Sequence, residues 1–168
     1  MDASFGFPSG IAVDLSGNLV VTDNNRIRIV TPESVVSMLA GSGEEAFAEG
    51  AGAAASFNYP HDVAVETSGS IVVADTFNHI IRKVTPRGVA STLAGNVGFH
   101  FADGTGVAAS FYYPSGVAVD AIGNVIVADT NNNCIRKVTP EASGVTLRMR
   151  LFSSSATKIL PAASTATP

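Results

Sequence analysis

Histidine is the residue type of this chain best suited to holding a metal ion or moving a proton near neutral pH. The three histidines are His61, His79 and His100. A metal site would need such side chains to converge from equivalent positions of the sequence. His61 directly precedes an apolar strand, where its counterparts are Ser9 and Ser115, and the other two histidines occupy unrelated positions. The pattern therefore predicts no metal ligand set and no cofactor, with His61 as a hydrogen-bonding surface residue.

Nucleophilic chemistry finds no better support. Cys134 is the only cysteine, so the chain has no disulfide framework and no thiolate cluster. Serines are abundant, but none lies in a nucleophile-elbow pattern. We therefore predict no catalytic residue.

The sequence contains a threefold repeat of short strands, and polar side chains gather where the second strand of each copy ends. Asp23, Asp75 and Asp129 close that strand in turn. Asp and Asn commonly accept hydrogen bonds from their own turns, so we interpret these aspartates as structural. The residues beside them would face one rim and form a polar recognition surface. With His61 at the mouth of a central channel, the candidate binding residues are Asn24, Asn25, Asn78, His79, Asn132 and Asn133.

The elements that must position these residues come from a threefold repeat. Ser4–Pro8, Ser56–Pro60 and Ser110–Pro114 each open the same series, and the three prolines are spaced 52 and 54 residues apart. Each series continues with four short Val- and Ile-rich segments separated by Gly, Asn and Pro, which is typical of an antiparallel β meander. The expected strands are Gly10–Asp14, Asn18–Asp23, Arg26–Thr31, Val35–Leu39, Asp62–Glu66, Ser70–Asp75, His79–Thr85, Val89–Leu93, Gly116–Asp120, Asn124–Asp129, Cys134–Thr139 and Val145–Leu151.

A repeat of this length predicts a β-propeller, in which radially stacked sheets cover one another's faces. The fold class is all-β: a partial propeller of three four-stranded antiparallel blades with long inter-blade loops. The blades are expected at about 1–40, 41–94 and 95–152, followed by a disordered tail rich in Ser, Ala, Thr and Pro at 153–168. The first copy opens within a connection, so we expect an arc of a larger ring, or a truncated gene product.

The connections 40–60 and 94–114 carry most of the aromatic residues, and we expect these rings to fill the wedge between adjacent blades. The charge of the chain limits the classes of partner that it could bind. The formal net charge is −4, and six of the ten basic residues lie in third strands. There the Arg28, Arg82 and Arg136 series is expected to pair with carboxylates or carbonyls. RNA binding would need a continuous basic face, so nucleic acid is not expected. No apolar run approaches the length that spans a bilayer, and the compartment cannot be read.

Three segments carry a resemblance to a known family. Ile71–Thr76, Asn78-His79-Ile80 and Ile81–Pro86 resemble the strands and central triplet of the NHL repeat, and Asn124–Thr130 with Ile135–Pro140 repeat the match. The first copy departs further, with Asn24-Asn25-Arg26 at the triplet. Members of this family are typically six-bladed propellers, so the resemblance implies half of one.

Function follows from the site rather than from the fold, because this fold serves several activities. The expected function is a non-catalytic NHL-repeat scaffold that binds a protein or another ligand. The alternative is a fragment of a metal-dependent six-bladed enzyme of the amidating-lyase or lactonase kind. Three blades leave a bare sheet face at each end, so a homodimer that closes a six-bladed ring is a further expectation.

Overall fold

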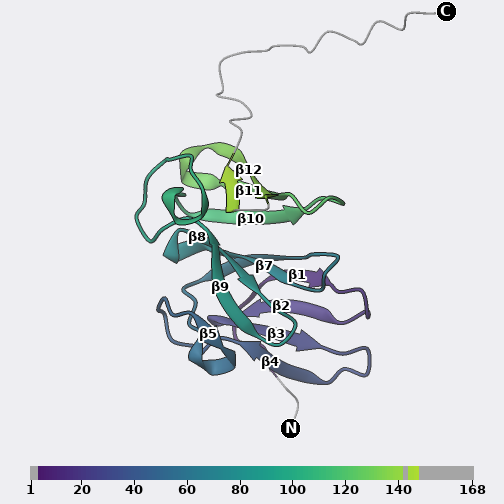
Figure 1. Ribbon diagram of the computed structural model, residues 1–168. Helices are drawn as coiled ribbons and strands as arrows, with labels where there is room; N and C mark the ends of the chain where they lie inside the picture. The colour runs from purple at the N-terminus through teal and green to yellow at the C-terminus, as the bar shows by residue number, and fades with distance from the viewer. Residues whose placement is uncertain (1–3, 142–143, 148–168) are drawn as a thin grey trace, which may run out of the picture.

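The computed structural model describes residues 4–141 and 144–147, which form three antiparallel sheets arranged in succession (Figure 1). The predicted all-β partial propeller is confirmed. The first sheet has the order β1-β2-β3-β4, the third the order β10-β11-β12-β13, and the middle one β6-β7-β8-β9 with β5 added beyond β9. The strands are β1 Pro8–Val13, β2 Leu19–Asp23, β3 Arg26–Val30, β4 Val36–Ala40, β5 Gly50–Ala51, β6 Pro60–Val65, β7 Ile71–Asp75, β8 Ile80–Val84, β9 Val89–Ala94, β10 Pro114–Val119, β11 Val125–Asp129, β12 Cys134–Glu141 and β13 Gly144–Leu147.

The observed strands match the predicted ones to within two residues where both ends are described. The short β5 was not predicted; it pairs with β9 through Gly50↔Ala90 and Ala51↔Val89. The last predicted strand, Val145–Leu151, is observed as β13, and its remaining residues and the predicted tail 153–168 lie outside the described part of the chain. The blade boundaries near residues 40 and 94 stay predictions.

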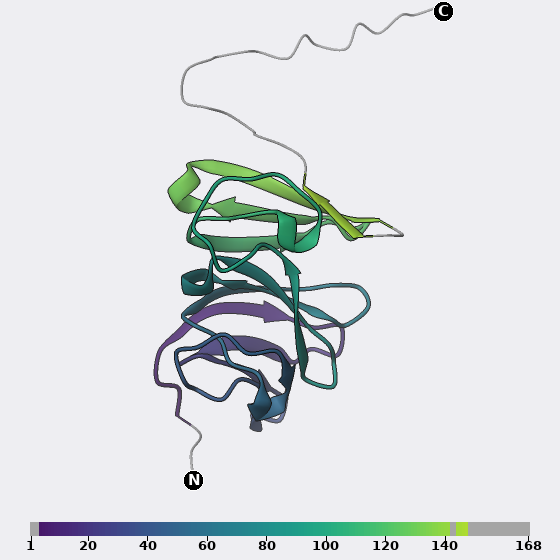
Figure 2. The same ribbon diagram turned by 60° about the vertical axis from the view of Figure 1, so that its left-hand side comes forward.

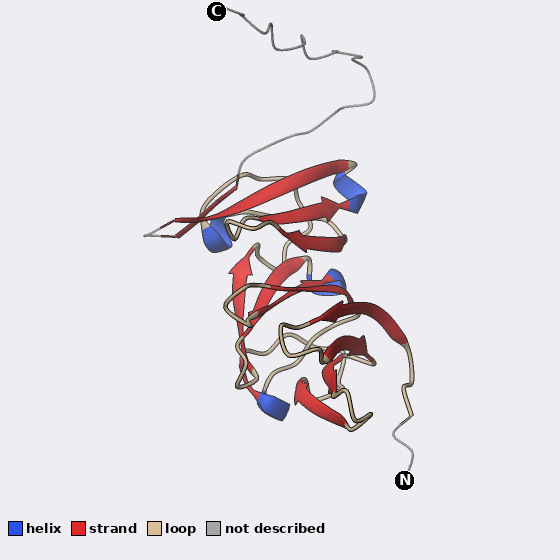
Figure 3. Ribbon diagram, turned by 90° about the vertical axis from the view of Figure 1, so that its right-hand side faces the viewer, coloured by secondary structure: helices blue, strands red, loops and turns tan. Residues whose placement is uncertain are grey.

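The helical segments of the described chain are short 3₁₀ turns, at Gly52–Ala54, Thr76–Asn78, Gly106–Ala108 and Thr130–Asn132 (Figure 3). No helix among the described residues is long and apolar enough to cross a membrane. The first blade lacks a 3₁₀ turn after its second strand because two residues close that hairpin. Asn24 and Asn25 both have positive φ, 46° and 59°, as a tight two-residue hairpin turn requires.

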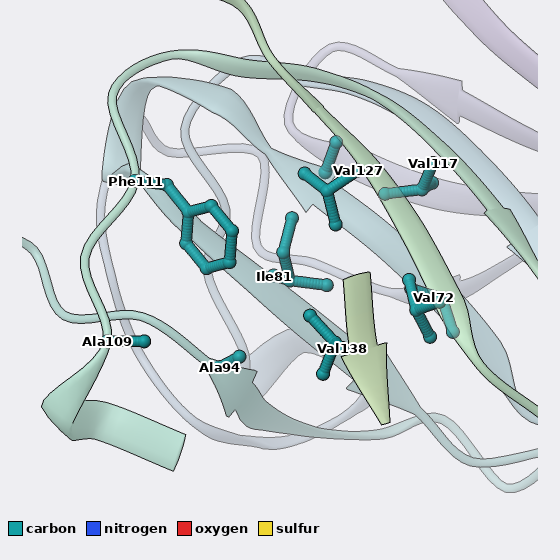
Figure 4. Close-up of a cluster of buried hydrophobic side chains, with 10 residues drawn as sticks. Val72, Ile81, Ala94, Ala109, Phe111, Val117, Val127 and Val138 are labelled. Atoms are coloured by element: carbon teal, nitrogen blue, oxygen red, sulfur yellow. The ribbon is translucent and has the colours of Figure 1, made fainter. Parts of the chain in front are cut away.

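Two apolar layers hold the three blades together. One layer lies between blades 1 and 2, and joins Val20 and Ile27 to Val63, Ile71 and Val73. The other joins blades 2 and 3, where side chains of both sheets pack together and Phe111 of the connection closes one side of the cluster (Figure 4). Each layer buries apolar strand faces that would otherwise be exposed to solvent. A four-stranded meander of this length is stabilised by this burial against its neighbours.

The expectation that the connection aromatics fill the wedge is right for one set and wrong for another. Phe57 and Phe111 are fully buried in the two layers, whereas Tyr59 and Phe99 are 47% and 61% exposed. Residues 57 and 59 would share a face in a regular strand, but the positive φ of Tyr59, 48°, turns the backbone and directs its ring away from the layer that buries Phe57. The connections therefore present rings to solvent as well as to the core.

The first strands of the blades lie beside one another on the inner side of the arc: β1 packs against β6, and β6 against β10 (Figure 2). Asp62 in β6 accepts a 3.0 Å hydrogen bond from the N–H of Val117 in β10 through Oδ2. Between β1 and β6 the approach is closer still, because a Cβ added to Gly10 would lie 2.5 Å from Asp62 Cα. This packing brings the ends of all three inner strands to one rim.

Candidate functional site

The connection rim is the surface formed by the turns after β2, β7 and β11 and by the residues that lead into β1, β6 and β10. Its foundation in the second blade is Asp75, which ends β7 and is completely buried. Its Oδ1 accepts a 2.8 Å hydrogen bond from the N–H of Asn58, and its Oδ2 accepts bonds from Asn78 Nδ2 at 2.9 Å and Arg82 Nη1 at 3.1 Å. One carboxylate thus joins the connection, the turn and the third strand.

Arg82 completes this arrangement from β8. Its guanidinium lies between the rings of Phe47 and Phe57, with Cζ 5.0 Å from each ring centroid. Its Nη1 donates to the carbonyl oxygen of Ser56 at 3.2 Å and its Nη2 to that of Ala48 at 2.9 Å. The predicted pairing of the arginine series with carboxylates and carbonyls is therefore confirmed, and these charges serve the architecture.

The other blades repeat the pair with different burial. In blade 3, Arg136 donates to Asp129 Oδ2 at 2.9 Å, and both side chains are buried. In blade 1, Arg28 donates to Asp23 Oδ2 at the same distance, but the Arg28 side chain is partly exposed. The structural interpretation of the three aspartates holds in every blade.

The pKa values of two of these aspartates move in opposite directions. Burial raises the pKa of Asp75 to about 6, although hydrogen bonds from Asn78 and the N–H of Asn58, and the charge of Arg82, act to lower it. Burial also acts to raise the pKa of Asp23, but the N–H groups of Phe7 and Gly6 and the Arg28 guanidinium outweigh it and leave that pKa below its usual value. The difference follows the depth of burial.

Two of the predicted binding residues are engaged within the fold. Asn78 is buried and uses Nδ2 on Asp75 Oδ2 and on the carbonyl oxygen of Ala46 at 3.0 Å. Asn132 makes the same bond to Asp129 Oδ2 at 2.9 Å and donates to the carbonyl oxygen of His100 at 3.3 Å. Their amide N–H groups hold the turns, and a ligand would have to displace these bonds.

Asn25 and His79 occupy equivalent positions, both with positive φ, and join successive blades. Asn25 Oδ1 accepts the N–H of Tyr59 at 2.8 Å, and His79 Nδ1 accepts the N–H of Tyr113 at 3.2 Å. We call these two contacts the latches. The tyrosines they hold have positive φ, 48° and 50°, which is rare for a bulky residue and clusters at functional sites.

Because Nδ1 of His79 is an acceptor, the imidazole is neutral and carries its proton on Nε2. Burial lowers the pKa of His79, while the nearby charge of Asp129 acts to raise it. The ring lies among aromatic neighbours, with centroid distances of 4.6 Å to Tyr113, 5.7 Å to Tyr112 and 5.9 Å to Phe99. His79 is therefore a buried residue that packs under the exposed rings of the rim and presents little of its side chain to solvent.

Four aromatic rings form a continuous line across the three blades on this rim, and we call them the aromatic line. The centroid distances are 6.3 Å from Phe7 to Tyr59, 4.9 Å from Tyr59 to Phe77 and 5.0 Å from Phe77 to Tyr113. Phe7, Tyr59 and Phe77 are exposed by 62%, 47% and 46%. Edge-on and tilted ring pairs of this kind keep one another in place while offering their outer faces.

Beside the aromatic line lies a small pocket of about 70 Å³, which brings three of the predicted binding residues together. Asn24, Asn25 and His61 line it with Phe7, Tyr59, Glu45, Ser9 and Pro60. His61 is exposed, and its Nδ1–H donates to the carbonyl oxygen of Ser115 at 2.8 Å, so Nε2 is the ring nitrogen left at the inner end of the rim. Amide, carboxylate and imidazole groups thus converge next to exposed rings.

The repeat itself decides the family. The model of the NHL repeat matches residues 5–31, 57–83 and 111–138, which contain the first two strands of each blade and all or most of the third. The chain is an NHL-repeat protein. Outside these matched residues lie the connections, which supply Glu45 and part of the aromatic packing.

Known proteins share this NHL architecture in larger molecules. The chain is 34% identical over 150 residues to Protein SUPPRESSOR OF QUENCHING 1, chloroplastic, of Arabidopsis thaliana, and the match covers 80% of this chain but 14% of that protein. An auxiliary nutrient binding protein from Bacteroides thetaiotaomicron has a similar fold, with a TM-score of 0.66 and 23% identity over 76% of this chain and 36% of that one.

An enzyme shares the fold as well. A catalytically inactive virginiamycin B lyase from Staphylococcus aureus, solved with quinupristin, superposes with a TM-score of 0.56 at 15% identity, over 87% of this chain and 42% of that one. Likeness at this level shows the NHL-type propeller alone, since binding proteins and enzymes both use it. Within residues 4–141 and 144–147, no group of three or more His, Cys, Asp or Glu side chains is placed to hold a metal ion.

Sequence reasoning located part of this rim and missed the aromatic line. His61, Asn24 and Asn25 meet in the pocket, Asn133 is exposed at the third blade, and Asn78, Asn132 and His79 lie beneath the surface or are engaged within it. Phe77 could have been singled out from the sequence, because blade 3 has Asn131 at the equivalent position. A residue that does not recur from repeat to repeat is not one that the fold of every blade requires.

Proposed function

We propose that this chain is a non-catalytic NHL scaffold that binds a protein partner on its connection rim. The observation that carries the proposal is the aromatic line from Phe7 to Tyr113, which crosses the three blades with most of its rings exposed. Aromatic rings are enriched at protein interfaces, where they supply a large contact area at low conformational cost. The chain spans only a small part of its plant relative. The proposed partner is therefore a partner of this chain, and nothing about it is taken from the relative.

The polar side chains beside the aromatic line are of the kind found at the rim of a protein interface. Asn24 and His61 offer donors and acceptors beside Tyr59, and Glu45 adds one carboxylate. A ring of polar groups around a central aromatic patch gives orientation, while the rings give most of the binding energy. At about 70 Å³, the pocket beside the aromatic line is smaller than the sites that enclose a small molecule.

The test compares binding by rim variants and by a matched surface variant. Tyr59→Ser and Phe77→Ser each remove an exposed ring of the aromatic line, whereas Leu15→Ser removes an exposed apolar side chain from the β1–β2 turn on the opposite rim. Proteins retained by the immobilised chain are identified, purified and titrated against each variant. We expect a loss of about tenfold or more in affinity for the rim variants. Equal affinity for all three variants would contradict the proposal.

The enzyme alternative has its own discriminator at His61. Metal analysis of the purified chain and of His61→Ala compares bound zinc and calcium directly. Stoichiometric metal in the natural sequence that disappears in His61→Ala would overturn the non-catalytic proposal, because it would make the rim imidazole a ligand.

A further inference from the structure

The outer part of blade 1 contains a second hollow, away from the aromatic line. It measures about 430 Å³ and is lined by Asp23, Arg26, Arg28, Met38, Ser4, Gly6, Asn24, Val36 and Ser37. We call it the Arg28 hollow. Its floor is the partly exposed Arg28–Asp23 ion pair, and one wall is β4, the outermost strand of the first sheet. In size it falls within the range of ligand sites in proteins.

Blades 2 and 3 show what the same place holds when it is filled. Over Arg82 lies the segment Phe47-Ala48-Glu49-Gly50: the ring stacks on the guanidinium, and the carbonyl oxygen of Ala48 accepts from Nη2. Over Arg136 lies Phe101-Ala102-Asp103-Gly104, with the ring 4.5 Å from Cζ and the carbonyl oxygen of Ala102 2.7 Å from Nη2. Two independent copies thus place the same sequence pattern on the same arginine.

The acidic residue of the pattern makes a defined contact in each copy. Asp103 Oδ1 pairs with Arg136 Nη2 at 2.7 Å. Glu49 Oε1 accepts the N–H of Thr92 at 2.8 Å, on the edge of β9. The glycine that follows continues into β5, whose Gly50 and Ala51 pair with Ala90 and Val89. The segment is therefore held by stacking in both blades, by an ion pair in blade 3 and by addition of a short strand to the outer edge of blade 2.

Blade 1 contains half of this arrangement. Phe5 stacks on Arg28 with its centroid 4.7 Å from Cζ, and the carbonyl oxygen of Ser4 accepts from Nη1 at 2.8 Å. These residues correspond to Phe57 and Ser56, which make the equivalent two contacts with Arg82 in blade 2. In the positions of Phe47 and Ala48, the described part of the chain places no ring or carbonyl on Arg28, and the hollow is found there.

We infer that the Arg28 hollow binds a Phe-Ala-Glu/Asp-Gly segment from the connection of another NHL repeat. The phenylalanine ring would cover the outer face of the Arg28 guanidinium, and the following carbonyl would accept from its Nη2. The acid would meet Arg28 or the N–H of Met38, which corresponds to Thr92. Two arginines line the hollow against one carboxylate, so an acidic segment is also favoured by charge.

A synthetic peptide supplies this occupant in trans. The peptide Glu-Ala-Phe-Ala-Glu-Gly-Ala-Gly-Ala repeats residues 45–53, and is titrated into the isotopically labelled full chain while NMR signals are followed. We expect saturable shifts at Val36–Met38 and at the Arg28 side chain. Replacing the peptide's phenylalanine by alanine removes the stacking, and replacing its glutamate by lysine reverses the charge; each should weaken binding by about fivefold or more.

Variants of the protein separate stacking from charge. Arg28→Lys keeps the charge but lacks the planar group, so it should lose about fivefold in affinity. Met38→Glu, at a half-exposed side chain, should repel the peptide without disturbing the core. The matched control is Lys83→Ala, which removes one positive charge from a surface pair with Glu66 in blade 2 and should bind as the natural sequence does.

Three results would overturn the inference. One is the absence of shifts at saturating peptide, and another is equal binding of the peptide without phenylalanine. The third is a set of shifts at Val36–Met38 that appears on raising the concentration of the chain alone and that the peptide does not displace, because a different surface of a second copy would then occupy the hollow. These outcomes are independent of the aromatic line, since no residue of that line borders the hollow.

Discussion

The buried ion pair of blade 2 is the residue-scale feature on which the rim depends most. The Arg82 and Asp75 side chains are fully buried, and the loss of one partner leaves the other charge without compensation. We predict that Arg82→Ala lowers the free energy of unfolding by about 3–5 kcal/mol. Arg28→Ala, at a partly exposed pair, should cost about 1 kcal/mol.

Urea unfolding followed by far-UV circular dichroism measures both losses. Lys83→Ala serves as the control, because its pair with Glu66 is at the surface and should contribute little. Adding Asp75→Asn to Arg82→Ala should restore part of the stability, since the orphaned carboxylate is removed. Equal losses for Arg82→Ala and Arg28→Ala would show that burial does not set the strength of the pair.

His79 makes the stability of the rim depend on pH. Its pKa is lowered by burial, so the folded chain takes up the proton less readily than the unfolded chain does, whose histidines titrate near about 6.5. The contribution of His79 to stability is therefore present above about pH 6.5 and is lost as the pH falls through the lower folded pKa. Protonation would also remove the Nδ1 acceptor of the Tyr113 N–H.

The matched variant is His79→Asn, because asparagine stands at the same position with positive φ in blades 1 and 3. We expect the melting temperature of the natural sequence to fall more between pH 7.5 and 5 than that of His79→Asn. Asp75, whose raised pKa acts in the opposite direction over this range, is common to both chains and cancels in the comparison. The same pH dependence in both chains would contradict the role assigned to His79.

At the scale of elements, the close approach of β1 and β6 requires a residue without a side chain. A Cβ at Gly10 would lie 2.5 Å from Asp62 Cα and 2.8 Å from the carbonyl oxygen of His61. We predict that Gly10→Ala separates the two blades and costs about 1–3 kcal/mol in unfolding free energy. At Gly116, the equivalent position of blade 3, the nearest atom is Ala128 Cβ at 3.3 Å, so Gly116→Ala should cost less.

The same elements show how far the sequence could predict the molecule. Repeated Val- and Ile-rich segments determined the strands, because pairing and burial impose the same pattern in every blade. The αL tyrosines at 59 and 113 could not be predicted, since their conformation comes from latches to Asn25 and His79 in the preceding blade. The exposed side of the rim depends on such contacts between repeats, which no single repeat encodes.

At the scale of the whole molecule, the latches are complementary at the two ends of the arc. Asn133 in blade 3 has positive φ, as Asn25 and His79 have, and its side chain is exposed. At the other end, the N–H of Phe7 is equivalent to that of Tyr59 but donates to Asp23 Oδ1 at 2.7 Å, so a latch to Asn133 would exchange this bond for one to the asparagine. Two copies related by a two-fold axis would bring Asn133 of one to Phe7 of the other and cover the open sheet faces.

We therefore predict a dimer that light scattering detects and that two substitutions weaken. Ile11→Lys places a charge on the open face of blade 1, where Ile11 is 62% exposed, and Asn133→Gly removes the latch while permitting positive φ. Ile122→Lys, on the opposite rim, is the control and should leave the dimer intact. Residues 141–168 carry no Phe-Ala-Glu/Asp-Gly pattern, so this dimer would not supply that segment to the Arg28 hollow. Ile11→Lys should then abolish association and leave peptide binding unchanged, whereas a natural sequence that stays monomeric at high concentration would rule out the ring of two copies.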